Sequence, residues 1–195
     1  MALWGTSDAD ESKPKNLTTA EKKEVFANNS GWVREAGSIW SGNDNTDADP
    51  EVLVAVSGLA DSIGAADITD VEWITSTADK SAGFTLSVRV RWNEAVTVTG
   101  NPTLAVTNGN QGSGSGRGPH TLVYASGTGT NELVFSLAIA AANAATNAND
   151  VLSVGAQTIA LAGGTIKDTA DGTTVSARAI SGAQGTACGS VTVVA

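Results

Sequence analysis

The residues able to carry out nucleophilic or acid–base catalysis are few and isolated in this chain. His120 is the single histidine and Cys188 the single cysteine among 195 residues. A Ser/His/Asp or Cys/His arrangement would have to use His120, which follows Pro119 at the start of an expected strand, a position typical of the surface. Cys188 has no catalytic motif around it, and no G-x-S-x-G turn occurs in the sequence. We therefore expect a protein that is not an enzyme, and we expect its lone thiol to be an inert small side chain.

The acidic residues raise the question of whether the chain binds calcium. Asn45, Asp47 and Asp49 have the alternate spacing of oxygen ligands in a calcium loop. Pro50 stands where an EF-hand requires glycine, and Val56 where it requires the closing glutamate, so the segment is not an EF-hand.

Two pairs of carboxylates, Asp67/Asp70 and Asp168/Asp171, could be imagined as acid and base, but turn chemistry between strands explains them adequately. A non-standard calcium site in the acidic loop, or at Asp168 and Asp171, stays an open alternative to solvated acidic loops. No other cofactor is expected.

The tryptophans of the N-terminal segment suggest a more specific function than the acidic residues do. Trp4, Trp32 and Trp40 lie in a polar segment with few large apolar residues, and aromatic side chains that a chain cannot bury tend to anchor interfaces. We therefore expect these three residues to bind a partner. The alternative is a small satellite cluster that closes one end of the fold. Trp73 and Trp92 alternate with polar positions and are expected to pack inside the chain.

Charge and hydropathy exclude several classes of partner. The net charge is -9 and the basic residues are dispersed, so nucleic acid is not an expected partner. No stretch offers the ~20 continuous apolar residues of a membrane span, and no membrane partner is expected. The opening residues, MALWGTSDADESKPK, lack the apolar core of a signal peptide, so export by a conventional signal of its own is not expected.

Alternating apolar residues predict an all-β fold. Between Phe84 and Gly100, every second side chain from Leu86 to Val90 is apolar, which is typical of a half-buried antiparallel strand. Strands are also predicted at 52–56, 68–74, 103–107, 120–125, 132–139, 151–154, 157–161, 165–167 and 190–194. The expected core contains Leu86, Val88, Val90, Leu133, Phe135, Leu137 and Ile166, with Arg89 and Arg91 outside.

Three regions follow from this pattern. Residues 1–50 form a small, mostly irregular N-terminal attachment region with one short helix at Ala20–Asn28, begun by a capping box at Thr18–Glu21. Residues 51–80 supply connecting strands, and residues 81–195 form a sandwich.

Three ordered motifs, NEAVTVTGNPTLAV, LVYASGTGTNELVFSLAI and LAGGTIKDTADG, make the chain resemble a known repeat. Over about Ser81 to Ala179 it is similar to the bacterial immunoglobulin-like repeat of large cyanobacterial surface adhesins, which also occurs in virion proteins of tailed phages. This resemblance implies an immunoglobulin-like β-sandwich. The segments KPKNLTTAEKKEVFANNSGWVRE, EVLVAVSGLA and ADITDVEW resemble the openings of small virion structural proteins from tailed phages of marine bacteria.

Together the resemblances imply a virion structural protein, a capsid decoration or accessory protein that displays an immunoglobulin-like domain. Its expected partners are virion proteins such as the major capsid protein, with a host-surface component and self-association as open alternatives. Two other functions remain open: a cell-surface adhesion or glycan-binding module, and a tail or neck accessory protein. A fold alone does not name a function. The single copy of the domain and the non-repeating N-terminal region favour the virion role over the adhesion module.

Overall fold

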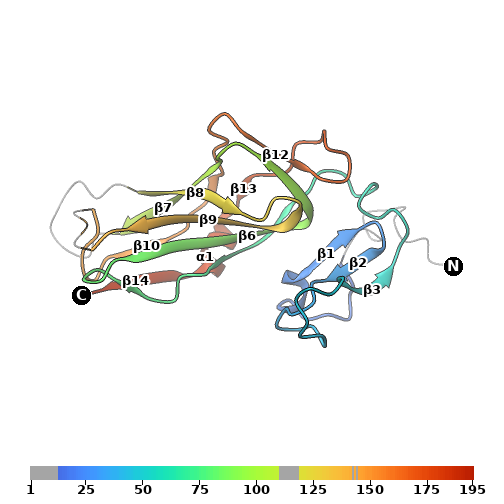
Figure 1. Ribbon diagram of the computed structural model, residues 1–195, viewed down its shortest axis with the longest axis horizontal. Helices are drawn as coiled ribbons and strands as arrows, with labels where there is room; N and C mark the ends of the chain where they lie inside the picture. Colours follow the sequence, from blue (N-terminus) through green and yellow to red (C-terminus); the bar gives the residue numbers. More distant parts are fainter. Residues whose placement is uncertain (1–12, 110–118, 142, 144) are drawn as a thin grey trace.

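The computed structural model describes residues 13–109, 119–141, 143 and 145–195, and this part of the chain is mostly β. Figure 1 shows strands β1 to β3 in a small lobe at one end and the other labelled elements in a larger lobe. The described strands are β1 (Val25–Asn28), β2 (Gly31–Arg34), β3 (Glu51–Ala55), β4 (Ile68–Trp73), β5 (Ala78–Asp79), β6 (Phe84–Thr99), β7 (Thr103–Gly109), β8 (His120–Ser126), β9 (Thr130–Ile139), β10 (Val151–Ser153), β11 (Gln157–Thr158), β12 (Thr165–Asp168), β13 (Ala179–Ile180) and β14 (Ser190–Val194). The helical elements are the 3₁₀ turn η1 (Glu21–Lys23) and helix α1 (Gly182–Cys188).

The small lobe, residues 13–63, is called the N-terminal unit here. Its strands β1, β2 and β3 form an antiparallel sheet in that order. Gly31 permits the close approach of β2 to β3, because an added Cβ would lie 2.0 Å from the carbonyl oxygen of Val54. The unit has its own apolar cluster of Val25, Ala27, Trp32 and Leu59, against which Leu17, Leu53, Val54, Val56 and Ile63 pack.

The helix expected at Ala20–Asn28 is wrong, whereas most of the described residues 13–50 lie outside helices and strands, as expected. The Thr18–Glu21 capping contacts do form: the backbone N–H of Thr18 donates to Glu21 Oε2 at 2.8 Å. They start only the three-residue turn η1, after which Val25 to Asn28 pair with Arg34 to Gly31 as a hairpin. Tertiary pairing of Val25 and Phe26 therefore outweighs the local helix signal.

The larger lobe, residues 66–195, is called the C-terminal unit here. Strand β6 pairs with β9 along one edge and, along the other, first with β4 and then with β12. From β9 the sheet continues through β8, β7, β10 and β14 to β5, and all these strands contribute to one core. Strands β11 and β13 form a separate pair. The result is a sandwich-like all-β unit whose last strands pack back against its first.

The expected core residues confirm the alternation, with two exceptions. Leu86, Val88, Val90, Leu133, Phe135 and Ile166 are fully buried. Leu137 is only half-buried. Arg91, expected outside, is buried, because the N-terminal unit covers the polar face of β6 at this point.

The segment 51–80 does not form a separate connector. Strand β3 completes the sheet of the N-terminal unit, whereas β4 pairs with β6 and β5 with β14. The change from one unit to the other therefore falls between Ile63, which packs in the first cluster, and Ala66, which is buried in the second. The C-terminal unit begins before the expected position 81.

Helix α1 was not expected from the sequence. Ser181 and Gln184 form a reciprocal capping box at its start, and the Gln184 side chain donates to the carbonyl oxygen of Ile68 at 2.8 Å. The Ser-x-x-Gln pattern is the signal that could have revealed it.

Candidate functional site

Opposite charges face one another on three neighbouring strands where the two units meet. Asp70 and Glu72 on β4 are register partners of Arg91 and Arg89 on β6. Arg91 is also opposite Glu132 on β9. Because these positions alternate along their strands, all five side chains lie on one face of the sheet.

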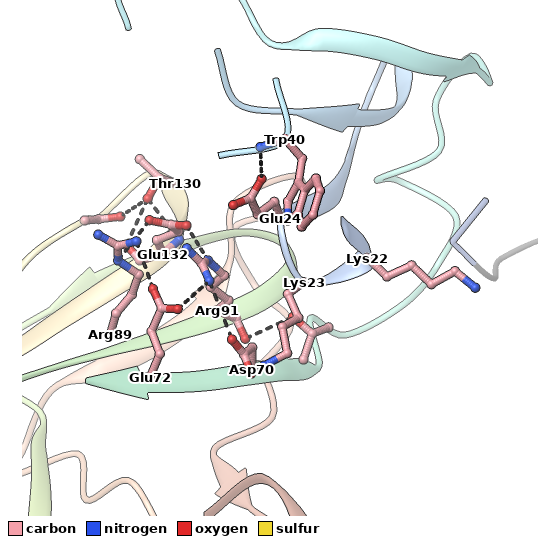
Figure 2. A network of polar contacts seen from close by, with 12 residues as sticks. Lys22, Lys23, Glu24, Trp40, Asp70, Glu72, Arg89, Arg91, Thr130 and Glu132 are labelled. Carbon is pink, nitrogen blue, oxygen red and sulfur yellow. Dashed lines mark hydrogen bonds and ion pairs between the residues drawn. The ribbon is translucent and has the colours of Figure 1, made fainter. Parts of the chain in front are cut away.

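The five side chains form a continuous ion-pair network (Figure 2). Arg89 Nη1 lies 3.0 Å from Glu72 Oε1, and Arg89 Nε lies 3.3 Å from Glu132 Oε2. Arg91 Nη1 lies 3.1 Å from Glu72 Oε2 and 3.5 Å from Asp70 Oδ2, while Arg91 Nε donates to Glu132. The network was missed at the sequence level, although two arginines alternating on one strand and two acids on another were its signal.

The N-terminal unit covers part of this network. Lys23, in η1, places its Nζ 2.8 Å from Asp70 Oδ1. The side chains of Arg91 and Asp70 keep only 8% and 5% of their surface exposed. Asp70 therefore lies in a strand within a buried ion pair, and its expected place in a turn is wrong. The Lys23–Asp70 ion pair connects the two units, and removing one partner of a buried ion pair is strongly destabilising.

A loop beyond the network presents two apolar side chains to solvent. Ile39 is 86% exposed and Trp40 is 48% exposed. The backbone of Trp40 is held on both sides: its N–H donates to Glu24 Oε2 at 3.2 Å, and its carbonyl accepts from Arg34 Nη1 at 2.6 Å. The loop therefore presents the indole from a fixed backbone, which lowers the entropic cost of binding a partner through it.

A cleft of about 310 Å³ separates this loop from the network. Its walls include Ile39 and Glu35 from the loop, and Arg89 and Glu132 from the sheet. Burial, and secondly the charge of Glu132, raises the pKa of Glu35. Nearby, burial lowers the pKa of Lys13 to about 7, although Asp70 opposes this shift. The cleft thus combines glutamate and arginine side chains with the apolar side chains of Ala36 and Ile39.

The three expected partner-binding tryptophans have different positions. Trp4 lies outside the described residues. Trp32 is 1% exposed in the core of the N-terminal unit, so it is a packing residue and has no surface to offer a partner. Trp40 alone of these residues is found exposed. Trp92 is buried, and Trp73 packs against the same core, which confirms their expected packing roles.

The two candidate catalytic residues lie apart from the cleft. The expectation of a surface His120 is wrong: its ring is buried, lies 3.1 Å from Thr146 Oγ1, and has a pKa lowered by desolvation. Cys188 is half-buried, and burial raises the pKa of its thiol to about 11. Since the thiolate is the nucleophilic form, Cys188 is a poor nucleophile at neutral pH.

Several of the calcium candidates of the sequence accept hydrogen bonds from backbone N–H groups close to them in the chain. Asn45 Oδ1 accepts from the backbone N–H of Asp47 at 3.2 Å. Asp171 accepts from the backbone N–H groups of Thr173 and Thr174, and hydrogen bonds from Thr174 and Thr173 lower its pKa to about 2. Asp168 was expected in a turn but is the last residue of β12, where it pairs with Val96; it is buried and accepts from the N–H of Ala170 at 2.8 Å. Within the described ranges, no three His, Cys, Asp or Glu side chains form a metal-binding group.

Comparison with family models, with curated proteins and with solved structures finds no match to this chain. In the part of the chain that the structure describes, no helix has the length and apolar character needed to cross a membrane.

Proposed function

We propose that the chain is a non-enzymatic structural protein of a tailed-phage virion, a capsid decoration or accessory protein. Its N-terminal unit attaches to the particle lattice through Ile39 and Trp40. Its C-terminal unit is an immunoglobulin-like domain displayed away from the lattice. Virion proteins such as the major capsid protein are the partners.

The exposed Ile39–Trp40 pair carries this proposal. Interfaces are anchored by a few large side chains, Trp among the most frequent, on supports that do not rearrange. Trp40 meets both conditions, because nearly half of its surface is exposed and its backbone is bonded to Arg34 and Glu24. The ion pair between Lys23 and Asp70 then joins the unit that carries this anchor to the C-terminal unit.

The placement of the three sequence motifs supports the immunoglobulin-like part of the proposal. The first motif spans the end of β6, a turn and β7, and the second spans the β8–β9 hairpin. The third leads into β12, which pairs with β6. All three therefore belong to one connected sheet, as the resemblance to the adhesin-type repeat requires.

The surroundings of His120 and Cys188 support a non-enzymatic role. His120 is engaged with Thr146 inside the fold, and the Cys188 thiol is held in its unreactive protonated form. Neither lines the cleft, whose titratable groups include acids already paired with arginines.

The test compares particle binding by wild type and by the double variant Ile39→Ser/Trp40→Ala. Co-sedimentation with particles that lack the protein should be lost in this variant, whose fold is checked by circular dichroism. Val175→Ser is the matched control, because Val175 is an exposed apolar residue of the C-terminal unit at 57% exposure. It should bind as wild type does.

Normal occupancy of the double variant would refute attachment through this loop. Absence of the protein from purified particles by mass spectrometry would refute the virion role altogether. Binding to intact bacterial cells or to surface glycan in its place would favour the adhesion alternative.

A further inference from the structure

A buried carboxyl group lies at the seam between the two units. Glu94, on β6, is 1% exposed, and neither of its carboxyl oxygens has a hydrogen-bond partner among the described residues. Trp92 and Val96, two positions before and after it on the same strand, are fully buried, so Glu94 continues the buried side of β6. Burying a charged carboxylate there is strongly unfavourable, whereas burying the neutral, protonated form costs much less.

The charges that surround Glu94 disfavour its ionisation. Burial is the main cause that raises the pKa of Glu94 to about 8, and the charges of Asp168, Asp171 and Asp67 act in the same direction. Asp168 ends β12, Asp171 lies in the loop that follows, and Asp67 directly precedes β4. Asp61, in the N-terminal unit, adds to the raised pKa of Asp168. Within the part of the chain that the structure describes, each charge that acts on Glu94 is therefore negative.

The N-terminal unit covers this place through a small contact. The backbone pairing of β1 with β6 consists of one bridge, and that bridge joins Ala27 to Glu94 itself. A hollow of about 150 Å³ lies beside Glu94, where Ala27, Asn28, Asn29 and Ala60 line it from the N-terminal unit. None of these four side chains is titratable. The cover therefore supplies neither a cation nor a second acid to Glu94, and it is incomplete.

We propose that Glu94 makes the contact between the two units sensitive to pH. While Glu94 is protonated, the two units stay closed over it. Ionisation of Glu94 places an unpaired negative charge near three aspartates inside the seam. Separation of the units relieves this cost, because it exposes the carboxylate to water. This inference stands independently of the proposed attachment role.

Separation of the units releases a proton, so a rising pH favours it. The closed arrangement holds the Glu94 proton up to about pH 8, whereas a carboxyl group exposed by separation has the ordinary glutamate pKa of 4.5. Between these two pH values the separated form has lost the proton and the closed form has kept it. The ratio of separated to closed molecules should therefore rise by up to about tenfold per pH unit in this range and level off above it.

Single-molecule energy transfer in the full chain measures this ratio. Donor and acceptor dyes are attached at Asp47→Cys in the N-terminal unit and Val123→Cys on β8, two exposed positions, in a Cys188→Ser background. With Glu94 present, a population with a longer distance between the dyes should grow from about pH 5.5 to about pH 8.5. In Glu94→Gln, whose amide does not ionise, the distribution of distances should be the same at both pH values.

Urea unfolding gives a second readout. Between about pH 5.5 and about pH 8.5, the unfolding equilibrium constant of Glu94→Gln should fall at least about tenfold relative to that of wild type. Glu94→Leu, which is also uncharged, should do the same, so the result does not depend on the folding of one variant.

Glu51→Gln is the matched control, because it makes the same change at an exposed glutamate on β3 and should respond to pH as wild type does. A distance between the dyes that does not change with pH while Glu94 is present would overturn the proposal. An equal change in Glu94→Gln, or loss of the pH response in Glu51→Gln, would overturn it too.

Discussion

Truncation of Trp32 should unfold the N-terminal unit and leave the C-terminal unit folded. Trp32 is 1% exposed and is the largest side chain in a cluster whose other buried members are Val25, Ala27 and Leu59. Replacing a buried tryptophan with alanine costs about 3–5 kcal/mol. A single core in a segment below about 70–80 residues rarely supplies more than about 3–5 kcal/mol. The loss in Trp32→Ala therefore equals the stability that this unit has on its own.

Native-state hydrogen exchange measures this loss strand by strand. In Trp32→Ala, the amides of β1, β2 and β3 should exchange rapidly, while those of β6 and β9 keep their protection, because their core contains none of the same residues. Trp32→Phe should be milder, since the indole N–H has no hydrogen-bond partner among the described residues to lose.

Trp40→Ala is the matched control, because its side chain is 48% exposed and the change should stay within about 0.5 kcal/mol. Retained protection of β1 to β3 in Trp32→Ala, with a loss below about 1 kcal/mol, would refute the packing role of Trp32. Equal losses of unfolding free energy in Trp32→Ala and Trp40→Ala would contradict the distinction between a packing role for Trp32 and an exposed, partner-binding role for Trp40.

Three further predictions concern the C-terminal unit. Arg91→Ala should cost about 3–5 kcal/mol in urea unfolding, because it removes a buried cation that pairs with Asp70, Glu72 and Glu132. Arg89→Ala, at a side chain 31% exposed, should cost about 1 kcal/mol or less, and equal losses would contradict the difference in burial. Phe135→Ala should cost about 3–5 kcal/mol, and a loss below about 1 kcal/mol would contradict its place in the core. Cys188, with a pKa raised by burial to about 11, should react slowly with a disulfide reagent at pH 8 and faster only as the pH approaches 11. Because the pKa of the thiol is higher in the folded state, the thiol favours the folded state below about pH 9, and that contribution to stability is lost as the pH rises toward 11. Rapid labelling of the folded protein at pH 7 would contradict the burial of Cys188.

The local sequence pattern was sufficient to predict a strand wherever one face of that strand packs against the core. The alternation from Leu86 to Val90 predicted β6 and its buried side chains, because an antiparallel strand with one polar face repeats every two residues. The β8–β9 hairpin and β14 were predicted for the same reason.

Local pattern failed where a distant segment changes the environment of a residue. Arg91 has the alternation of a surface position, yet Lys23 of another unit covers its partner Asp70. His120 follows a turn, yet the segment carrying Thr146 encloses it. Val25 and Phe26 follow a formed capping box, yet they pair with Arg34 and Val33. Each case depends on a contact between residues that no local window contains.

The seam between the two units also determines how the molecule responds to mechanical force. Strand β6 pairs with β9 from Phe84 to Arg91, so tension along β6 acts on many backbone hydrogen bonds at once. The backbone pairing between β1 and β6 consists of one bridge, Ala27 to Glu94. A pull that separates the units therefore acts on that bridge and on side-chain pairs such as Lys23–Asp70 before it reaches the sheet of the C-terminal unit. Under load the molecule should extend first by opening at the seam, with both units still folded.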